Sequence, residues 1–135
     1  MDRSEMTKTA ETVIARQDVG DVDGIVELFA EDVTFMMPIL PEPLRGRDAL
    51  RANVNGWPKA ITNTEWVMIE GNHLVCAWNW RGEGWPDDLP LLRGVSSFIF
   101  NDDGLIQEYE DFFDPDWITR TSAGLNPLLT KQQSA

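Results

Sequence analysis

The sequence is short of several residues on which common functions depend. It holds one cysteine and one histidine among 135 residues. Cys76 has no partner for an intrachain disulfide, and no cysteine cluster for zinc exists. Since His73 is the sole imidazole, a metal site would have to be built almost wholly from carboxylates. We therefore expect no metal, and because the sequence has no Gly-rich phosphate loop we expect no cofactor either. Cys76 is interpreted as a small buried hydrophobic residue.

Long apolar runs and positive charge are also scarce. No apolar run approaches the roughly 20 residues that a membrane helix needs. The N-terminal stretch MDRSEMTKTAETVIARQ lacks a signal-peptide core, so we expect a cytoplasmic protein without membrane contact. Lysine and arginine number 11 against 23 acidic residues, which gives a net charge of -12. Nucleic acid is therefore not an expected partner, because phosphate binding relies on basic side chains.

What remains is an ordinary globular composition. The chain is 42% hydrophobic and 25% charged, which is typical of a folded domain. Its length suits one domain with one core. We predict a single domain over residues 1–135, with an ordered core over about residues 4–120 and a flexible C-terminal tail.

The first half of the sequence predicts helices. Apolar residues recur every three or four positions over residues 4–17, with Ser4 as the N-cap, and over residues 22–30, with Asp21 as the cap. A third short helix is predicted over residues 47–57. A strand over residues 31–38 ends at a proline-rich stretch, PILPEPLRG, which is expected to be an extended loop.

The second half predicts two hairpins. Residues 64–83 contain two strands joined by a tight turn at Gly71 and Asn72, and residues 91–113 contain two more with a turn over residues 102–104. A final helical turn is predicted over residues 114–120. Helices followed by paired strands indicate an α+β fold with helices packed on one face of an antiparallel sheet.

Four stretches carry a resemblance to a known family: GDVDGIVELFAEDVTFMMP, LRGRDAL, HLVCAWNWRGE and RGVSSFIFNDDGLIQEYEDFFDP. Together with the connecting segments they cover residues 12–115. In order and spacing they resemble the nuclear transport factor 2-like superfamily, and within it the branch of limonene epoxide hydrolase and SnoaL-like polyketide cyclases. The resemblance implies a cone-shaped curved sheet with three helices on its concave face. It also implies a deep apolar pocket and a homodimer formed through the outer sheet face.

The same resemblance suggests catalytic groups. Limonene epoxide hydrolase uses two carboxylates held by an arginine, and here Arg81, Glu83 and the acid of YEDFFD, Asp111, match that pattern. Asp111 shares a strand face with Tyr109 and Phe113, so desolvation should raise its pKa unless an arginine offsets the effect. We predict Asp111 as the principal proton-transfer group, with Glu83 as its counterpart and Arg81 orienting both. The alternative is that Arg81 and Glu83 form a solvated pair at the rim.

Aromatic and apolar residues near these positions predict the substrate pocket. Trp78 and Trp80 have the opposite parity to Arg81, so they are predicted on the outer face, in a dimer interface. Trp85 is interpreted as part of the pocket wall or mouth. The substrate-binding residues that we predict are Tyr109, Phe35, Met37, Trp57, Trp66, Asn79 and Phe113.

Two departures from the hydrolase pattern bear on function. The segment FMMP offers no polar side chain to position a water, and Glu83 replaces an expected aspartate. The first hypothesis is a cofactor-free acid–base enzyme that opens an epoxide on a hydrophobic small molecule, with water or an internal nucleophile. The alternatives are a cyclase or isomerase of the SnoaL or ketosteroid isomerase kind, and a non-catalytic ligand-binding module. Convergence of Asp111, Arg81 and Glu83 would favour epoxide chemistry, whereas Asp111 alone would favour the cyclase or isomerase.

Overall fold

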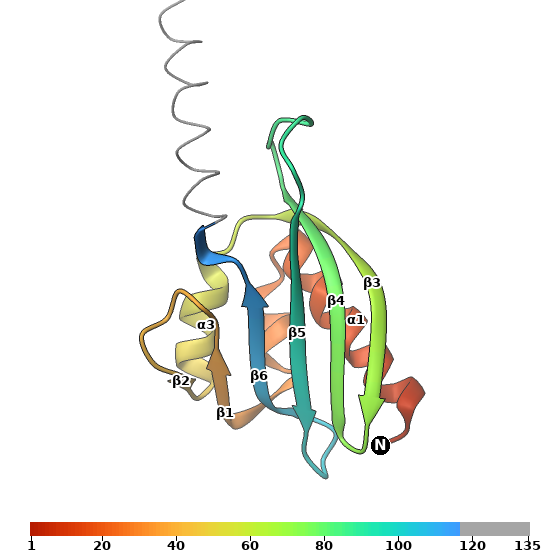
Figure 1. Ribbon diagram of the computed structural model, residues 1–135. Helices are drawn as coiled ribbons and strands as arrows, with labels where there is room; N and C mark the ends of the chain where they lie inside the picture. The colour runs from red at the N-terminus through yellow and green to blue at the C-terminus, as the bar shows by residue number, and fades with distance from the viewer. Residues whose placement is uncertain (117–135) are drawn as a thin grey trace, which may run out of the picture.

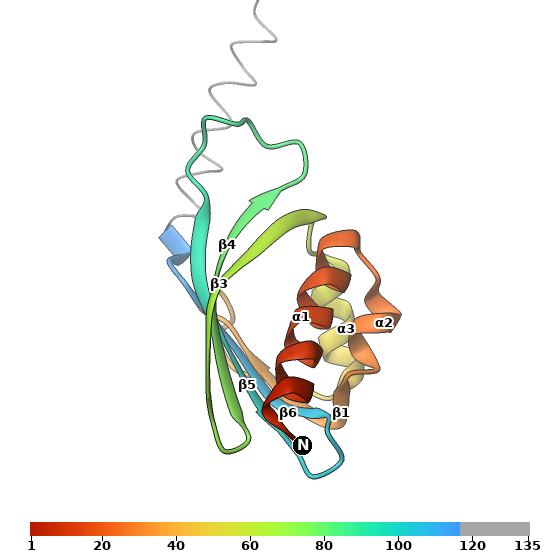
Figure 2. The same ribbon diagram turned by 90° about the vertical axis from the view of Figure 1, so that its right-hand side faces the viewer.

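The computed structural model describes residues 1–116, and these form one curved sheet with helices on one side (Figures 1 and 2). The six strands are arranged in the order β2-β1-β6-β5-β4-β3. Figure 2 shows the helices on the concave side of the sheet, opposite its open outer face. The predicted α+β fold is therefore confirmed.

The first helix, α1, spans Arg3–Val19. Its cap is Asp2 rather than the predicted Ser4. The Asp2 carboxylate accepts a hydrogen bond from the Glu5 amide at 2.8 Å, and the Glu5 side chain bonds back to the Asp2 amide at 3.2 Å. This reciprocal arrangement satisfies two amides that the first helical turn leaves unpaired. Gly20 ends the helix with a φ of 76°, a left-handed conformation that glycine adopts without strain.

The next two elements depart from prediction. Helix α2 spans Val22–Val26 with the predicted cap Asp21, and it does not continue to residue 30. Strand β1, Phe29–Met36, begins there instead, because Phe29 pairs with Ile106 in the sheet. The proline-rich stretch is not wholly loop, since it holds the short strand β2, Leu44–Arg45. Helix α3 follows over Arg47–Asn55, as predicted.

Both predicted hairpins are confirmed. The first consists of β3, Ala60–Glu70, and β4, His73–Gly82, which turn at Gly71 and Asn72. The second consists of β5, Leu92–Phe100, and β6, Ile106–Phe113. Strand β1 lies beside β6 and runs parallel to it, whereas the other pairs are antiparallel. Strand β6, the last strand within residues 1–116, therefore lies in the middle of the sheet.

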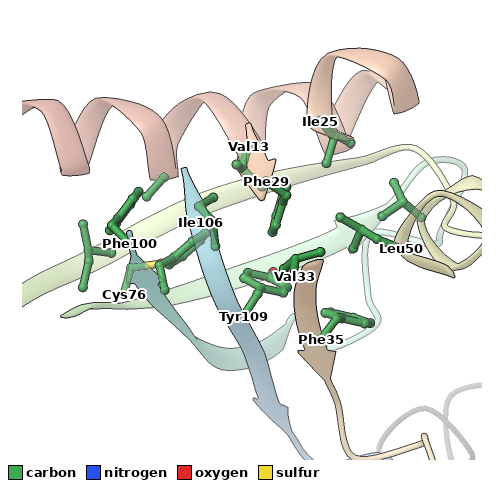
Figure 3. Packing of buried hydrophobic residues seen from close by; sticks show 14 of the residues in the cluster. Val13, Ile25, Phe29, Val33, Phe35, Leu50, Cys76, Phe100, Ile106 and Tyr109 are labelled. Carbon is green, nitrogen blue, oxygen red and sulfur yellow. The ribbon is translucent and has the colours of Figure 1, made fainter. Parts of the chain in front are cut away.

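The core lies between the helices and the inner sheet face (Figure 3). At its centre the Tyr109 ring stacks on Phe35, with ring centroids 5.3 Å apart, and meets Phe29 edge-on at 5.7 Å. Phe98 packs against the same ring at 5.0 Å. Such aromatic pairs add to the free energy gained from burial alone. The side chains around Tyr109 are thus closely packed.

The strand register separates the residues of the two sheet faces. Directly opposite residues in paired strands point to the same side. One row across the inner face comprises Cys76, Ser96 and Asp111, all buried. The adjacent row, on the outer face, comprises Trp66, Ala77, Val95 and Phe112. In that row Trp66 is 46% exposed and Phe112 is 50% exposed.

Two further predictions concern the ends of the chain and the membrane. The predicted flexible tail, and most of the predicted final helical turn, lie beyond residue 116 and thus outside the described residues. Within residues 1–116, no helix is long and apolar enough to cross a bilayer.

The close approach at Gly94 yields a stability prediction. A Cβ at Gly94 would lie 2.5 Å from Cζ2 of Trp78 and 2.7 Å from the Phe112 carbonyl oxygen. Because that carbonyl belongs to the backbone, Gly94→Ala should lower the free energy of unfolding by about 1–3 kcal/mol in urea denaturation. The control Gly56→Ala, where the nearest atom is 3.5 Å away, should change it by less than about 0.5 kcal/mol. Equal stability of the two variants would contradict this packing.

Candidate active site

The buried carboxyl of Asp111 is the centre of the site. Asp111 lies on β6, is 6% exposed and stands opposite Ser96 on β5. The Ser96 hydroxyl donates to Asp111 Oδ1 at 2.6 Å. Behind it, the Trp78 indole Nε1 donates to Ser96 Oγ at 2.8 Å. Three adjacent strands therefore contribute one side chain each to a continuous chain of hydrogen bonds.

Burial changes the acidity of Asp111. Desolvation raises its pKa from 3.8 to about 6, since the charged form loses its hydration. Hydrogen bonding from Ser96, and then from Tyr109, opposes the shift, and the charge of Glu110 adds a smaller rise. Both protonation states of Asp111 are therefore accessible near neutral pH, as proton transfer requires.

The two titratable neighbours on the inner face stay neutral at that pH. Desolvation, followed by the charge of Asp111, raises the pKa of Tyr109 well above 10 and that of Cys76 to about 12. Cys76 is buried, as predicted from its strand pattern. Among residues 1–116, no group of three or more histidine, cysteine, aspartate or glutamate side chains is arranged to hold a metal ion.

A small cavity adjoins Asp111. Its volume of about 30 Å³ is enough for roughly one water molecule. It is lined by side chains from α1, the α3–β3 connection and four strands, namely Ile14, Gln17, Trp57, Pro58, Thr62, Trp78, Trp80, Ser96, Tyr109 and Asp111.

A larger apolar hollow of about 310 Å³ lies beside this cavity. The two share Trp57, Pro58 and Trp80, which form the wall between them. Trp85, from the β4–β5 loop, packs edge-on against Trp80 with ring centroids 4.9 Å apart. Met37, Ile39 and Leu92 contribute further apolar surface. An apolar space of this size can hold a small hydrophobic molecule.

Most of the predicted pocket residues from β1, β6 and the segments that follow β1 and α3 lie in or near this region. Asp111, Tyr109 and Trp57 line the small cavity, and Met37 lines the adjoining hollow. Phe35 packs against the Tyr109 ring by stacking on it. Phe113 is half-buried against the core and lines neither space.

The predicted partners of Asp111 lie elsewhere, so the three residues do not converge. Arg81 donates to the Pro86 carbonyl at 3.2 Å and pairs with Asp87 at 3.4 Å, which ties the β4–β5 loop to β4. Glu83 is exposed in that loop, where its amide bonds the Lys59 carbonyl at 2.8 Å. The prediction of an arginine bridging two acids is wrong here. Arg81 points to the opposite face of the sheet from Asp111.

The same correction applies to the tryptophans of β4. Trp78 and Trp80 line the inner cavity rather than the outer face, because β4 turns its even-numbered residues toward the helices. Asn79 consequently lies on the outer face, where its Oδ1 accepts a hydrogen bond from Asn63 Nδ2 at 3.2 Å. Trp66 is also on the outer face and cannot line the pocket.

Sequence reasoning missed Ser96 and Gln17 and misplaced Trp78. One signal for Trp78 was present, since Cys76 was predicted to be buried and shares its parity on the strand. Ser96 carried no comparable signal, because its role depends on standing opposite Asp111 in the register. Gln17, at the end of α1, reaches the site only through helix–sheet packing.

Comparison with known protein families identifies the family of this chain. A model of the SnoaL-like domain family matches residues 10–109, and the protein belongs to that family. This agrees with the resemblance found in the sequence.

Solved structures show the same fold. A putative isomerase from Bacillus subtilis aligns with a TM-score of 0.76 and 20% identity, covering 92% of this chain and 97% of that one. An epoxide hydrolase/cyclase-like enzyme of pyran ring formation in salinomycin aligns with a TM-score of 0.72 and 20% identity, covering 85% and 95%. A putative ketosteroid isomerase from Kribbella flavida aligns with a TM-score of 0.69 and 19% identity, covering 82% of this chain and 78% of that one. At these identities the likeness establishes the nuclear transport factor 2-like fold, which hosts different activities.

The raised pKa of Asp111 predicts a pH-dependent stability. Between about pH 4 and pH 6 the folded protein holds a proton on Asp111 that the unfolded chain has lost. The contribution of Asp111 to stability should therefore fall as pH rises through this window. Urea unfolding of wild type and Asp111→Asn at several pH values should show the wild type losing about 3 kcal/mol relative to the variant. A difference that does not vary with pH would contradict the raised pKa.

Proposed function

We propose that this protein is an acid–base enzyme of the isomerase or cyclase type, acting on a hydrophobic small molecule, with Asp111 as the proton-transfer group. The observation that carries the proposal is one buried carboxyl, with a pKa of about 6, in the wall of a small cavity beside an apolar hollow. A group that titrates near neutral pH can both take and return a proton at useful rates.

The proposed step is a proton transfer on carbon. Ionised Asp111 takes a proton from a carbon next to a carbonyl, and the electron pair of the broken C–H bond moves into the substrate as an enolate. In an isomerisation the protonated Asp111 returns the proton to a different carbon. In a ring closure the enolate carbon attacks a carbonyl carbon of the same substrate, the π pair of that carbonyl moves onto its oxygen, and the proton goes from Asp111 to the new alkoxide. Neither step consumes water.

The substrate is proposed to occupy the apolar hollow and reach Asp111 past the tryptophan wall. The cavity at Asp111 is too small for an organic molecule, whereas the adjoining hollow of about 310 Å³ is not. A shift of Trp57 or Trp80, which both spaces share, would join them. The apolar lining favours a neutral, largely hydrophobic substrate such as a polyketide or terpenoid.

Epoxide opening is the second candidate, in its intramolecular form. The specific observation in its favour is that a carboxyl with a pKa of about 6 is protonated often enough to donate to an epoxide oxygen. A hydroxyl of the substrate would then form the new C–O bond as the epoxide C–O bond breaks, and its proton would pass to the Asp111 carboxylate. Hydrolysis is less well supported, because Glu83, the predicted counterpart of Asp111 in handling a water, lies in an exposed loop. A ligand-binding module without turnover is the non-catalytic alternative.

The outer sheet face is proposed to pair with a second copy of the chain. The row of Trp66, Ala77, Val95 and Phe112 presents two half-exposed aromatic rings, and Met68 nearby is 65% exposed. Exposed aromatic and methionine side chains of this kind are enriched in protein interfaces. The predicted homodimer thus keeps its support, although from Trp66 and Phe112 rather than from Trp78 and Trp80.

Turnover of a substrate panel tests the role of Asp111. The panel comprises unsaturated ketones, polyketide-like diketones, hydroxy-epoxides and simple epoxides, followed by NMR or mass spectrometry. Asp111→Asn should lower kcat by about 10²–10⁴-fold on any substrate that is turned over, since the amide cannot accept the proton. The matched control Glu83→Gln should retain kcat within about twofold. An equal decrease of kcat in both variants, or an unchanged kcat in Asp111→Asn, would overturn the assignment of Asp111 as the proton-transfer group.

Equilibrium sedimentation tests the assembly. Phe112→Lys should weaken the dimer by at least about 30-fold, because a buried aromatic anchor contributes roughly 2 kcal/mol or more. Val19→Lys is the control, since Val19 is 65% exposed at the end of α1 and lies away from this face. A wild-type protein that stays monomeric at high concentration would refute the proposed dimer.

A further inference from the structure

The hydrogen bond between Trp78 and Ser96 can run in one direction only, and that direction favours Ser96 as the donor to Asp111. The indole Nε1–H of tryptophan is a donor and cannot accept. It lies 2.8 Å from Ser96 Oγ, so the serine oxygen is the acceptor in that bond. A serine hydroxyl has a single proton, which Ser96 keeps for a second bond. Asp111 Oδ1 lies 2.6 Å away and is a much nearer acceptor than the Tyr109 hydroxyl at 3.5 Å.

We propose that Trp78 and Ser96 are positioning residues for Asp111: Trp78 fixes the Ser96 hydroxyl as a donor, and Ser96 thereby keeps Oδ1 an acceptor. The proton that Asp111 gains and loses is then carried on Oδ2. The inference deepens the proposed function, on which its catalytic meaning rests, although the hydrogen-bond direction itself is independent of any substrate.

The other groups that surround Asp111 bring little charge close to its carboxyl. Beside Asp111 itself, the cavity wall in the described part of the chain includes no charged side chain, and α1 contributes Ile14 and Gln17 there. Tyr109 from β6 and Cys76 from β4 have raised pKa values and stay neutral. Glu110, on the outer face, adds only the smallest of the influences on the pKa of Asp111. Ser96 is the strongest of the influences that stabilise the ionised form.

Removal of either positioning residue should make Asp111 a weaker acid. Without Ser96, the carboxylate loses its short hydrogen bond. Without the Trp78 donor, the Ser96 hydroxyl is free to rotate and accept a hydrogen bond from the O–H of neutral Asp111, which stabilises the neutral form. Each change should therefore raise the pKa of Asp111 by about one unit.

The test is a double-mutant cycle read by carboxyl ¹³C NMR titration of Asp111. The proteins are wild type, Trp78→Phe, Ser96→Ala and the double variant, each first checked for a native amide spectrum. Because Trp78 acts through Ser96, Trp78→Phe should raise the pKa in the wild-type background and have no effect in the Ser96→Ala background. Additive shifts, or no shift in either single variant, would overturn the proposal.

Two controls separate hydrogen bonding from packing. Trp80→Phe makes the same change of side chain in the same strand and the same cavity, and it should leave the pKa of Asp111 within about 0.3 units. Replacement of Trp78 by benzothienylalanine exchanges the indole N–H for sulfur and preserves the shape, so it removes the donor alone. It should reproduce the shift of Trp78→Phe and replaces that variant if Trp78→Phe does not fold. An unshifted pKa with this analogue would refute the role of Trp78.

A kinetic measurement links the inference to function without confusing the two. On any substrate found in the panel, the acidic limb of the pH–rate profile should move with the NMR pKa in every variant. If the cycle gives the expected couplings but wild type and Asp111→Asn turn over substrate equally, the proposed function fails and the hydrogen-bond assignment stands. If Asp111 proves essential but the cycle is additive, the proposed function stands and this inference fails.

Discussion

The hydrogen bond from Ser96 to Asp111 joins directly opposite positions of β5 and β6 at 2.6 Å. A carboxyl buried away from water is costly unless a donor replaces its lost hydration. Ser96 provides that donor, and Trp78 on the next strand holds it in place. The position of this acid in the centre of the sheet thus depends on three strands being in register.

The register also decides which side chains lie on the inner face of the sheet and which lie on the outer face. On the inner face, Trp57 and Trp80 separate a cavity at Asp111 from a larger apolar hollow. On the outer face, Trp66 and Phe112 remain half-exposed. Because the side-chain period of a strand is two, a shift of one residue in β4 would exchange these roles. The acid, the apolar space and the proposed dimer surface therefore follow from the same pairing.

Much of the fold was predictable because its signals are local. Helical periodicity identified α1 and α3, the Gly71–Asn72 turn identified the first hairpin, and Asp21 was recognised as a helix cap. Helix α2 was predicted too long because Leu28 and Phe29 continue an apolar pattern that suits a helix or a strand. The pairing of Phe29 with Ile106, 77 positions later, decided for the strand.

In the candidate site, too, local patterns were predictable and contacts between distant strands were not. Tyr109 and Asp111 were predicted from alternation along one strand, and the structure places both on the buried face. Arg81 and Glu83 were predicted from spacing, and spacing could not show that β4 directs Trp78 and Trp80 inward. The sequence by itself determined which residues share a strand face and that one acid lies among aromatic rings. Only the tertiary structure decided which face is buried and which donors meet the acid, because both depend on contacts between strands far apart in the chain.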